Sequence, residues 1–518
     1  MSDRVSVFSL RLRTVSVLSG LMPASAALAL TVCGLPSAFA GGFEIPANGT
    51  EALGRGGAFT AKADSPLALE YNVAGLAQQR GTHALIDNNL VFSRYRFARE
   101  GGDSFGPYPS VQADGSRPFY APWFGMTTDF GFFERFTFAF GIYGPSSIGQ
   151  RTFPMFVSDE SGKLRPGPTR YDVATTDLLI FFPTLAIGFR AHKMLDLGFS
   201  VQQASAQIKL ASATYAPQSL PVFPESAACT KQAEVAGCDS VTRFSGTSYD
   251  NYLLSLGALM HLGRSVDVGV NVRSASNLGI RPMTIRGTVA ATEPLYLQGA
   301  GIGAEQMDGE FTVWLPWVFR AGVRYGQKLG GMQLFDIELN AVYEAWSWLD
   351  GTDHYLTLKN PPPLVNRGEP LTITLPHRYK DTIGLRLGGS LYMPMTADAG
   401  VTMRMGGFYD SSASADQDLR LDFDTLAKLG ITAGLGVSMR GVELNAAYSY
   451  QHSLSRTVTS GELRIIDGTT GQPVRINDQV APAINNGTYS GSTHVLSLGL
   501  TLRFDEWRTS KALSSQSL

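Results

Sequence analysis

The chain has 518 residues, of which 17% are charged and 44% hydrophobic, and its formal net charge is −2. This near-neutral balance lacks the basic excess of a nucleic-acid-binding protein, so that class is excluded. After residue 41 there is no window of about 18 uninterrupted apolar residues, and no membrane-spanning helix is predicted. Strands of a membrane β-barrel remain compatible with this result, because only alternate residues of such strands face lipid.

Residues 1–40 have the pattern of a secretory signal. Three arginines within the first thirteen residues give a positive start, and residues 15–32 are mostly apolar or small. Ala38-Phe39-Ala40 then fits the small-x-small cleavage pattern. We therefore expect an exported protein whose mature chain begins at Gly41.

Residues 41–81 are rich in Gly and Ala and show no clean period. A segment of small side chains packs poorly alone, but it allows close backbone approach inside another structure. We predict that this segment is a plug enclosed by the rest of the chain.

Fourteen segments after residue 81 are rich in β-branched and aromatic residues and are predicted to be strands. They are Thr82–Phe97, Tyr120–Phe130, Arg135–Tyr143, Leu178–Ala191, Met194–Ala211, Thr247–Leu262, Ser265–Ala290, Gly309–Gly326, Met332–Trp348, His377–Met393, Thr396–Tyr409, Leu429–Arg440, Val442–Val458 and Ser490–Phe504.

Connection lengths separate a membrane barrel from a soluble sandwich. Seven long and six short connections alternate strictly, as expected for long outer loops and short periplasmic turns. A sandwich needs no such alternation. The predicted fold is therefore all-β: a 14-stranded antiparallel transmembrane barrel over residues 82–504, with the plug in its lumen and a polar tail at 505–518.

Several strands alternate apolar and polar residues, so each strand has one apolar and one polar face, and the two faces are expected to meet different surroundings. The polar faces are expected to line the lumen. Their carboxylates could support the plug or bind a substrate head group, or they could be ordinary lumen lining. The carboxylates are Asp336, Glu338, Glu344 and Glu443, and their candidate partners are Arg273, Arg386 and Arg503.

Two outer-loop features stand out. Cys229 and Cys238 lie in one loop of an exported chain, which favours a local disulfide over two free thiols or a metal pair. Apolar residues in the same loop and in loop 291–308 could form a hydrophobic landing site or pack against one another. These residues are Leu220, Val222, Phe223, Leu295, Tyr296 and Leu297.

Motifs for enzymatic chemistry are missing from the sequence. It has no Gly-x-Ser-x-Gly elbow and no Gly-x4-Gly-Lys-Ser/Thr loop. Its seven His do not pair at metal-ligand spacing. Acidic residues at 416, 418, 422 and 424 resemble a solvated face more than a calcium loop. We expect neither an enzyme nor a metal or other cofactor.

The plug, the strand count and several short motifs together resemble the FadL family of outer-membrane transporters for long-chain fatty acids and other hydrophobic compounds. Gly54-Arg55-Gly56-Gly57-Ala58 is similar to the family's hatch. Asn72, Ala74, Gly75 and Leu76 match its Asn-Pro-Ala-Gly-Leu signature, with Val73 in place of Pro. Residues 140–145, 343–347 and 378–382 are similar to its third, ninth and tenth strands. The likeness covers nearly the whole mature chain.

The resemblance implies a route for a hydrophobic ligand. The ligand lands among the outer loops, moves to a pocket beside the hatch, and leaves sideways into the membrane through a kinked third strand. The implied hatch residues are Gly41, Gly42, Phe43, Gly54, Arg55, Gly57, Asn72, Ala74 and Gly75. Gly141, Gly144 and Pro145 are the candidate kink, although such residues could also simply end the strand.

We therefore expect a monomeric protein of the bacterial outer membrane, in contact with its lipid and lipopolysaccharide. The predicted activity is passive, gated transport of hydrophobic molecules, with long-chain fatty acids as the favoured cargo. An aromatic-hydrocarbon channel and a structural or adhesive barrel that transports nothing are the alternatives.

Overall fold

The computed structural model describes residues 47–103, 105–114, 118–144, 150–158, 162–215, 228–292, 306–329, 332–361, 366–396, 398–423, 425–468 and 470–504. Within these ranges, no helix is long and apolar enough to cross a membrane.

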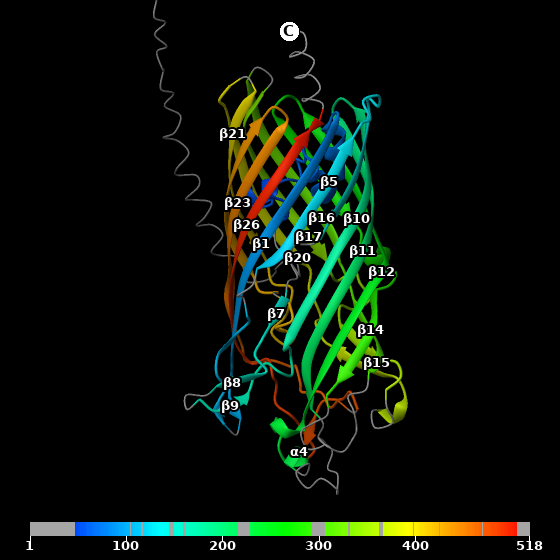
Figure 1. Cartoon of the computed structure of the whole chain (residues 1–518), viewed down its shortest axis with the longest axis vertical. Helices are drawn as coiled ribbons and strands as arrows, with labels where there is room; N and C mark the ends of the chain where they lie inside the picture. The colour runs from blue at the N-terminus through cyan, green and yellow to red at the C-terminus, as the bar shows by residue number, and fades with distance from the viewer. Residues whose placement is uncertain are drawn as a thin grey trace, which may run out of the picture. The chain divides into compact units, whose positions relative to one another are not determined.

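Fourteen of the described strands form a closed antiparallel ring. The ring closes because β1 pairs with β5 on one side and with β26, the last strand, on the other (Figure 1). The predicted fourteen-stranded barrel is thus confirmed. In order around the wall, the strands are β1 (Thr82–Arg99), β5 (Phe119–Thr128), β6 (Phe136–Tyr143), β10 (Thr175–His192), β11 (Leu195–Tyr215), β12 (Asp239–Leu262), β13 (Val266–Arg273), β16 (Trp317–Leu329), β17 (Met332–Ala345), β20 (Thr382–Pro394), β21 (Ala399–Asp410), β22 (Lys428–Met439), β23 (Val442–Val458) and β26 (Gly487–Arg503).

The wall strands turn apolar residues outward and polar residues inward. In β17, Leu339 is 57% exposed on the outer face, whereas its neighbours Glu338 and Asn340 are each 1% exposed. β23 repeats the pattern, with Leu444 exposed and Asn445 buried. This reversal of the usual burial rule follows from alternation of period two between lipid outside and a polar lumen inside.

The connections alternate in length around the barrel, as predicted. Short turns join β5 to β6, β10 to β11, β12 to β13, β16 to β17, β20 to β21 and β22 to β23. The other connections are long and carry the small outer elements, which gather at the opposite end of the barrel (Figure 1). These are β2 (Gly102–Asp103), β3 (Gly106–Pro107), β4 (Val111–Gln112), β7 (Gln150–Thr152), β8 (Phe156–Ser158), β9 (Leu164–Pro166), α4 (Ala228–Lys231), η4 (Ala236–Cys238), β18 (His354–Leu358), η7 (Asn366–Gly368), β19 (Leu371–Leu375), β24 (Arg475–Ile476) and β25 (Gln479–Val480).

The predictions of single strands over Ser265–Ala290 and Gly309–Gly326 were wrong. The first divides into β13, the 3₁₀ turn η5 (Ser276–Gly279) and β14 (Met283–Ala291), and the second divides into β15 (Gln306–Val313) and β16. Asn277 and Leu278 take left-handed φ angles of 48° and 61°, which no strand accommodates. Beyond this break, β15 leaves β16 and pairs with β18. The wall therefore continues outward as the sheet β14-β15-β18-β19.

Candidate functional site

The plug, residues 47–81, lies inside the barrel. It contains the short helices α2 (Thr50–Gly54) and α3 (Ala68–Tyr71) and the 3₁₀ turn η2 (Val73–Gln78). α2 contacts β21, β22, β23 and β26, while η2 contacts β6, β10, β11 and β12. The plug therefore touches opposite arcs of the wall, and most of its side chains are buried.

Arg55 is the ionic anchor of the plug. Its Nη1 lies 2.5 Å from Asp336 Oδ1 and its Nη2 lies 3.4 Å from Glu338 Oε2, with all three side chains almost fully buried. Glu338 also accepts backbone N–H bonds from Ala61 (2.7 Å) and Lys62 (3.0 Å). Burying these charges is tolerable only because each has a partner at hydrogen-bonding range.

Close backbone approach explains the glycines opposite this anchor. A Cβ at Gly388 of β20 would overlap the carbonyl oxygen of Arg55, and a Cβ at Gly406 of β21 would overlap its carbonyl carbon. Gly56 adds a left-handed φ of 65° at the same point. Here the plug needs small residues on both sides of the contact.

Asn72 organises the opposite arc. Its side chain donates to the carbonyls of Thr60 (2.9 Å) and Ala258 (3.2 Å), and accepts from the amide of Ala74 (3.2 Å), which caps η2. The backbone N–H of Val73, the residue between Asn72 and Ala74, donates to Asn271 Oδ1 of β13 (3.3 Å). A proline at position 73 would lack this donor, so the Val that departs from the family signature makes a bond to the wall that Pro could not make.

The plug also spans the closing seam of the barrel. The backbone N–H of Thr50 donates to Asp87 Oδ2 of β1 (2.8 Å), and its hydroxyl lies 2.7 Å from the Ser497 hydroxyl of β26. One plug residue is therefore bonded to both the first and the last strand.

β6 and β7 lie along the same side of β10. β10 pairs with β6 over 182–189 and with β7 over 175–177, and residues 145–149, which join β6 to β7, lie outside the described ranges. The plug reaches the end of β6, because Asn48 Nδ2 donates to the carbonyl of Gly144 (2.8 Å) and the Tyr143 hydroxyl donates to the carbonyl of Leu69 (3.0 Å). Contacts between plug and wall thus converge on the end of β6.

A continuous cluster of buried apolar side chains runs from this point of the plug toward the outer sheet. It begins on α3, follows the inward faces of the wall strands and continues through β14, β15, β18 and β19. Its members include Leu69, Tyr71, Trp123, Tyr143, Ile180, Phe182, Ile208, Phe244, Ile285, Phe311, Leu356 and Ile373. This cluster packs the plug against the wall strands and the outer sheet.

The lumen near the short turns is polar instead. A cavity of about 260 Å³ lies beside the plug and is lined by charged side chains from plug and wall, including Glu51, Lys62, Arg404, Glu443 and Arg503. Lys62 pairs with Glu51 at 3.0 Å, and Glu443 bridges Arg404 (3.0 Å) and Arg503 (2.9 Å). A charged cavity thus adjoins the plug at this end of the barrel.

Some of the charged residues predicted to pair across the lumen contact nearer groups instead. Arg386 does not reach the four candidate carboxylates; it pairs with Asp410 of the adjacent strand at 2.7 Å. Glu344 accepts from the Trp346 indole at 3.0 Å. Arg273 lies over the Phe182 ring, 5.6 Å from its centroid. Cross-strand neighbours are closer than groups across the lumen, and the sequence did not specify this register.

Several candidate residues lie outside the described ranges. These are Gly41, Gly42, Phe43, Pro145, Leu220, Val222, Phe223, Leu295, Tyr296 and Leu297. Sequence reasoning also missed Asp87, Asn271 and Arg404 as partners of the plug. Their inward polar positions on alternating strands were the available signal.

One outer loop holds a disulfide, and ion pairs join other outer loops. Cys229 and Cys238 form a disulfide with Cα atoms 5.8 Å apart. Of the four acidic residues expected to face solvent, Asp424 lies outside the described ranges and the other three are paired instead. Asp418 is 3% exposed and accepts from Arg378 at 2.8 Å, and Asp416 accepts from Arg456 at 2.6 Å.

A closed barrel that is apolar outside, polar within and filled by its own N-terminal segment defines the class of outer-membrane transport barrels. The chain belongs to the OMPP1/FadL/TodX family, because the family model described as "Outer membrane protein transport protein" matches residues 31–504. It is therefore an outer-membrane protein of a family that transports hydrophobic molecules, not a family of enzymes. No curated protein sequence matches the chain.

Solved structures share the fold. A Pseudomonas aeruginosa FadL homologue aligns with a TM-score of 0.66 at 16% identity, covering 90% of this chain and 100% of that one. The Ralstonia pickettii toluene transporter TbuX gives 0.57 at 15% identity, covering 88% and 98%. The P. putida toluene transporter TodX gives 0.58 at 14% identity, covering 89% and 99%. At these identities the likeness concerns the fold and does not indicate the cargo.

Proposed function

We propose that this protein is a gated, passive transporter that takes up long-chain fatty acids or similarly extended hydrophobic molecules. Ligand binds among the outer loops, moves along the apolar cluster to the plug, and leaves sideways through the wall where β6 ends. The observation that carries the proposal is the contact between the plug and this end, through Asn48 to Gly144 and Tyr143 to Leu69.

The physical case rests on the contrast between the apolar cluster and the charged cavity. An alkyl chain gains about 0.8 kcal/mol for each CH₂ that leaves water, so contact with the apolar cluster is favourable and the charged cavity beyond the plug is not. A ligand that reaches the plug therefore gains more by entering lipid sideways than by crossing the charged cavity. We place that exit at the end of β6, where the plug contacts the wall.

The length of the apolar cluster favours an extended cargo. The cluster joins the plug at Leu69 to the outer sheet at Ile373 through an unbroken series of buried side chains. A flexible alkyl chain can contact many of these side chains in succession, whereas a single aromatic ring contacts few at a time. An aromatic-hydrocarbon channel remains the second candidate, because it needs the same exit.

Mass spectrometry of organic extracts from the purified, detergent-exchanged protein tests the cargo. We expect a fatty acid near one molecule per chain, and added oleate should compete for the same site. Recovery of an aromatic compound, or binding of toluene but not oleate, would favour the second candidate. A barrel that is empty and binds neither ligand would support a structural or adhesive role.

Gating is tested separately, by uptake in cells whose barrel lacks residues 41–47. Uptake should fall while the barrel keeps its heat-modifiable mobility in gels. Normal uptake by the shortened protein would contradict gating by the N-terminal segment.

A further inference from the structure

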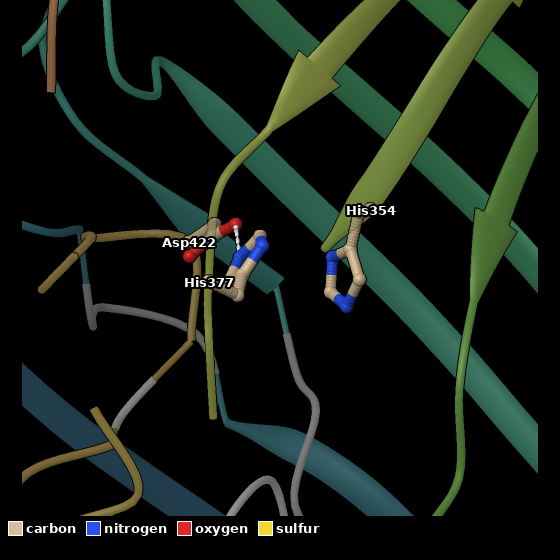
Figure 2. Close-up of side chains that lie close together, drawn as sticks. All are labelled: His354, His377 and Asp422. Carbon is tan, nitrogen blue, oxygen red and sulfur yellow. Dashed lines mark hydrogen bonds and ion pairs between the residues drawn. The ribbon is translucent and has the colours of Figure 1, made fainter. Parts of the chain in front are cut away.

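Three side chains with metal-ligating atoms meet in the outer part of the protein, away from the plug. His354 begins β18, His377 lies between β19 and β20, and Asp422 lies between β21 and β22 (Figure 2). One ligand atom from each lies within 4.8 Å of the others. Both imidazoles are buried, at 0% and 1% exposure. The three residues span 69 positions of sequence (422 − 354 + 1), so spacing could not reveal them.

Neighbouring groups orient His377 toward the centre of this cluster. One ring nitrogen, Nδ1, lies 2.8 Å from the carbonyl oxygen of Leu375, and the other, Nε2, lies 2.8 Å from Asp422 Oδ2. Its backbone N–H donates to Asp353 Oδ1, also at 2.8 Å. A metal-binding histidine is commonly held in this way, with one nitrogen on a backbone carbonyl and the other facing the ligand set.

The surroundings of the cluster are enclosed and aromatic. The His354 ring lies 5.6 Å from the Phe311 and Phe423 rings and 6.0 Å from the Tyr379 ring, centroid to centroid. The two imidazole centroids are only 3.9 Å apart. Polar rings stacked in an apolar shell are costly to bury unless their nitrogens find strong partners.

Ionisable groups inside the cluster perturb one another. Burial, with a further contribution from His377, holds the pKa of His354 well below its ordinary value. Burial opposes ionisation of Asp422, but His377 and Arg420 outweigh it and hold the pKa of that carboxyl below its usual range. Arg420 lies 3.6 Å from Asp422 and is itself neutralised by Asp172 at 2.8 Å.

We propose that His354, His377 and Asp422 bind a divalent transition-metal ion of the zinc class, which ties the β18–β19 hairpin to the loop between β21 and β22. Two imidazole nitrogens and one carboxylate oxygen form a set that zinc prefers, whereas calcium and magnesium prefer oxygen ligands alone. Three protein ligands leave a fourth tetrahedral position for water. The inference is independent of the identity of the cargo.

The geometry requires only small side-chain movements. Metal–ligand bonds of about 2.0–2.1 Å place tetrahedral ligand atoms about 3.3 Å apart. The three ligand atoms lie within 4.8 Å of one another, so side-chain rotation needs to close a separation by at most about 1.5 Å, while His377 Nε2 and Asp422 Oδ2, now 2.8 Å apart, separate slightly. On binding, the ion replaces the proton between His377 Nε2 and Asp422, and that proton passes to solvent.

Zinc and cobalt titrations of the full-length protein test this proposal. The protein is purified in detergent without a polyhistidine tag, treated with chelator and dialysed. We expect one Zn²⁺ per chain by calorimetry and elemental analysis, and Co²⁺ should give the intense visible bands of a tetrahedral site. His377→Gln and Asp422→Asn should each weaken zinc binding by more than about 100-fold, beyond the loss typical when a group that only orients a ligand is changed.

His452→Gln is the matched control, because this exposed histidine of β23 lies in a wall strand rather than in the cluster. It should bind zinc as the unaltered protein does, and heat-modifiable mobility checks that each variant is folded. Equal binding by His377→Gln and Asp422→Asn would overturn the proposal as adventitious binding only. If those variants do not fold, the unaltered protein alone decides the matter, because absence of saturable zinc binding or an octahedral cobalt spectrum would also overturn it.

Discussion

Replacing Arg55 by Met tests whether ion pairing holds the plug in place. The change removes the cation between Asp336 and Glu338 while keeping an unbranched side chain of similar reach. Breaking one partner of a buried ion pair costs about 3–5 kcal/mol. The lower figure applies here, because Asp336 keeps Arg324 at 3.4 Å and Glu338 keeps its two backbone N–H donors.

A cost of about 3 kcal/mol raises the population of the undocked plug about 10²-fold. Single-channel recording in planar bilayers should therefore show openings that the unaltered protein lacks, and plug amides should exchange hydrogen faster. Far-ultraviolet circular dichroism should be unchanged, since the wall strands keep their pairing.

Arg440→Met is the control for this experiment. Arg440 is exposed in a short turn and lies 3.6 Å from the equally exposed Asp398, a pair worth about 0–1 kcal/mol. Adding Asp336→Asn to Arg55→Met should restore part of the docking by removing one of the two buried carboxylates that lose the Arg55 cation. Recordings as quiet as those of the unaltered protein, or equal openings in the Arg440 variant, would refute the reasoning.

Three further substitutions test other parts of the site. Gly388→Leu should displace the plug, because its Cβ overlaps the Arg55 carbonyl, and plug amides should lose protection from hydrogen exchange. Asn48→Ala removes the bond to the Gly144 carbonyl, worth about 1 kcal/mol, and should change fatty-acid uptake severalfold with barrel stability kept. Cys229→Ser breaks the loop disulfide and should lower the stability of the outer loops by about 0–5 kcal/mol, seen as faster proteolysis there.

Each of these has a result that would count against it. Gly237→Ala introduces a Cβ into open space. If it reduced the protection of plug amides as much as Gly388→Leu does, the loss of protection in the Gly388 variant would be unspecific. Unchanged uptake by the Asn48 variant would mean that the contact between the plug and the end of β6 has no role in transport. Proteolysis at the same rate with and without the disulfide would mean that the ion pairs alone hold the loops.

The barrel could be predicted from the sequence because its signal is repeated in every strand. Alternation of period two and the alternating connection lengths are local properties, and both survive in the structure. The interruption at Asn277 could not be predicted, because an apolar segment with soft boundaries looks continuous until its φ angles are known. Backbone geometry at one or two residues decided that difference.

The site was harder to predict from the sequence, because its contacts join residues far apart in the chain. Arg55 stood out within a glycine-rich segment, yet its partner Glu338 lies 283 positions away. His354 and Asp422 likewise meet only through the arrangement of the outer loops. Inward polar positions could be predicted from the alternation, but which of them pair depends on register and on the path of the plug.

The two hydrogen bonds that join Thr50 to Asp87 and Ser497 have a consequence for how the protein is assembled. These two partners come together only when the last strand reaches the first, so the plug cannot reach its final position on an open sheet. The plug therefore docks only after the barrel has closed, and its hydrogen bonds then stabilise the pairing of β1 with β26 from inside the lumen. We expect barrels whose plug cannot dock to accumulate as late, unzipped intermediates on the insertion machinery, rather than as finished but leaky pores.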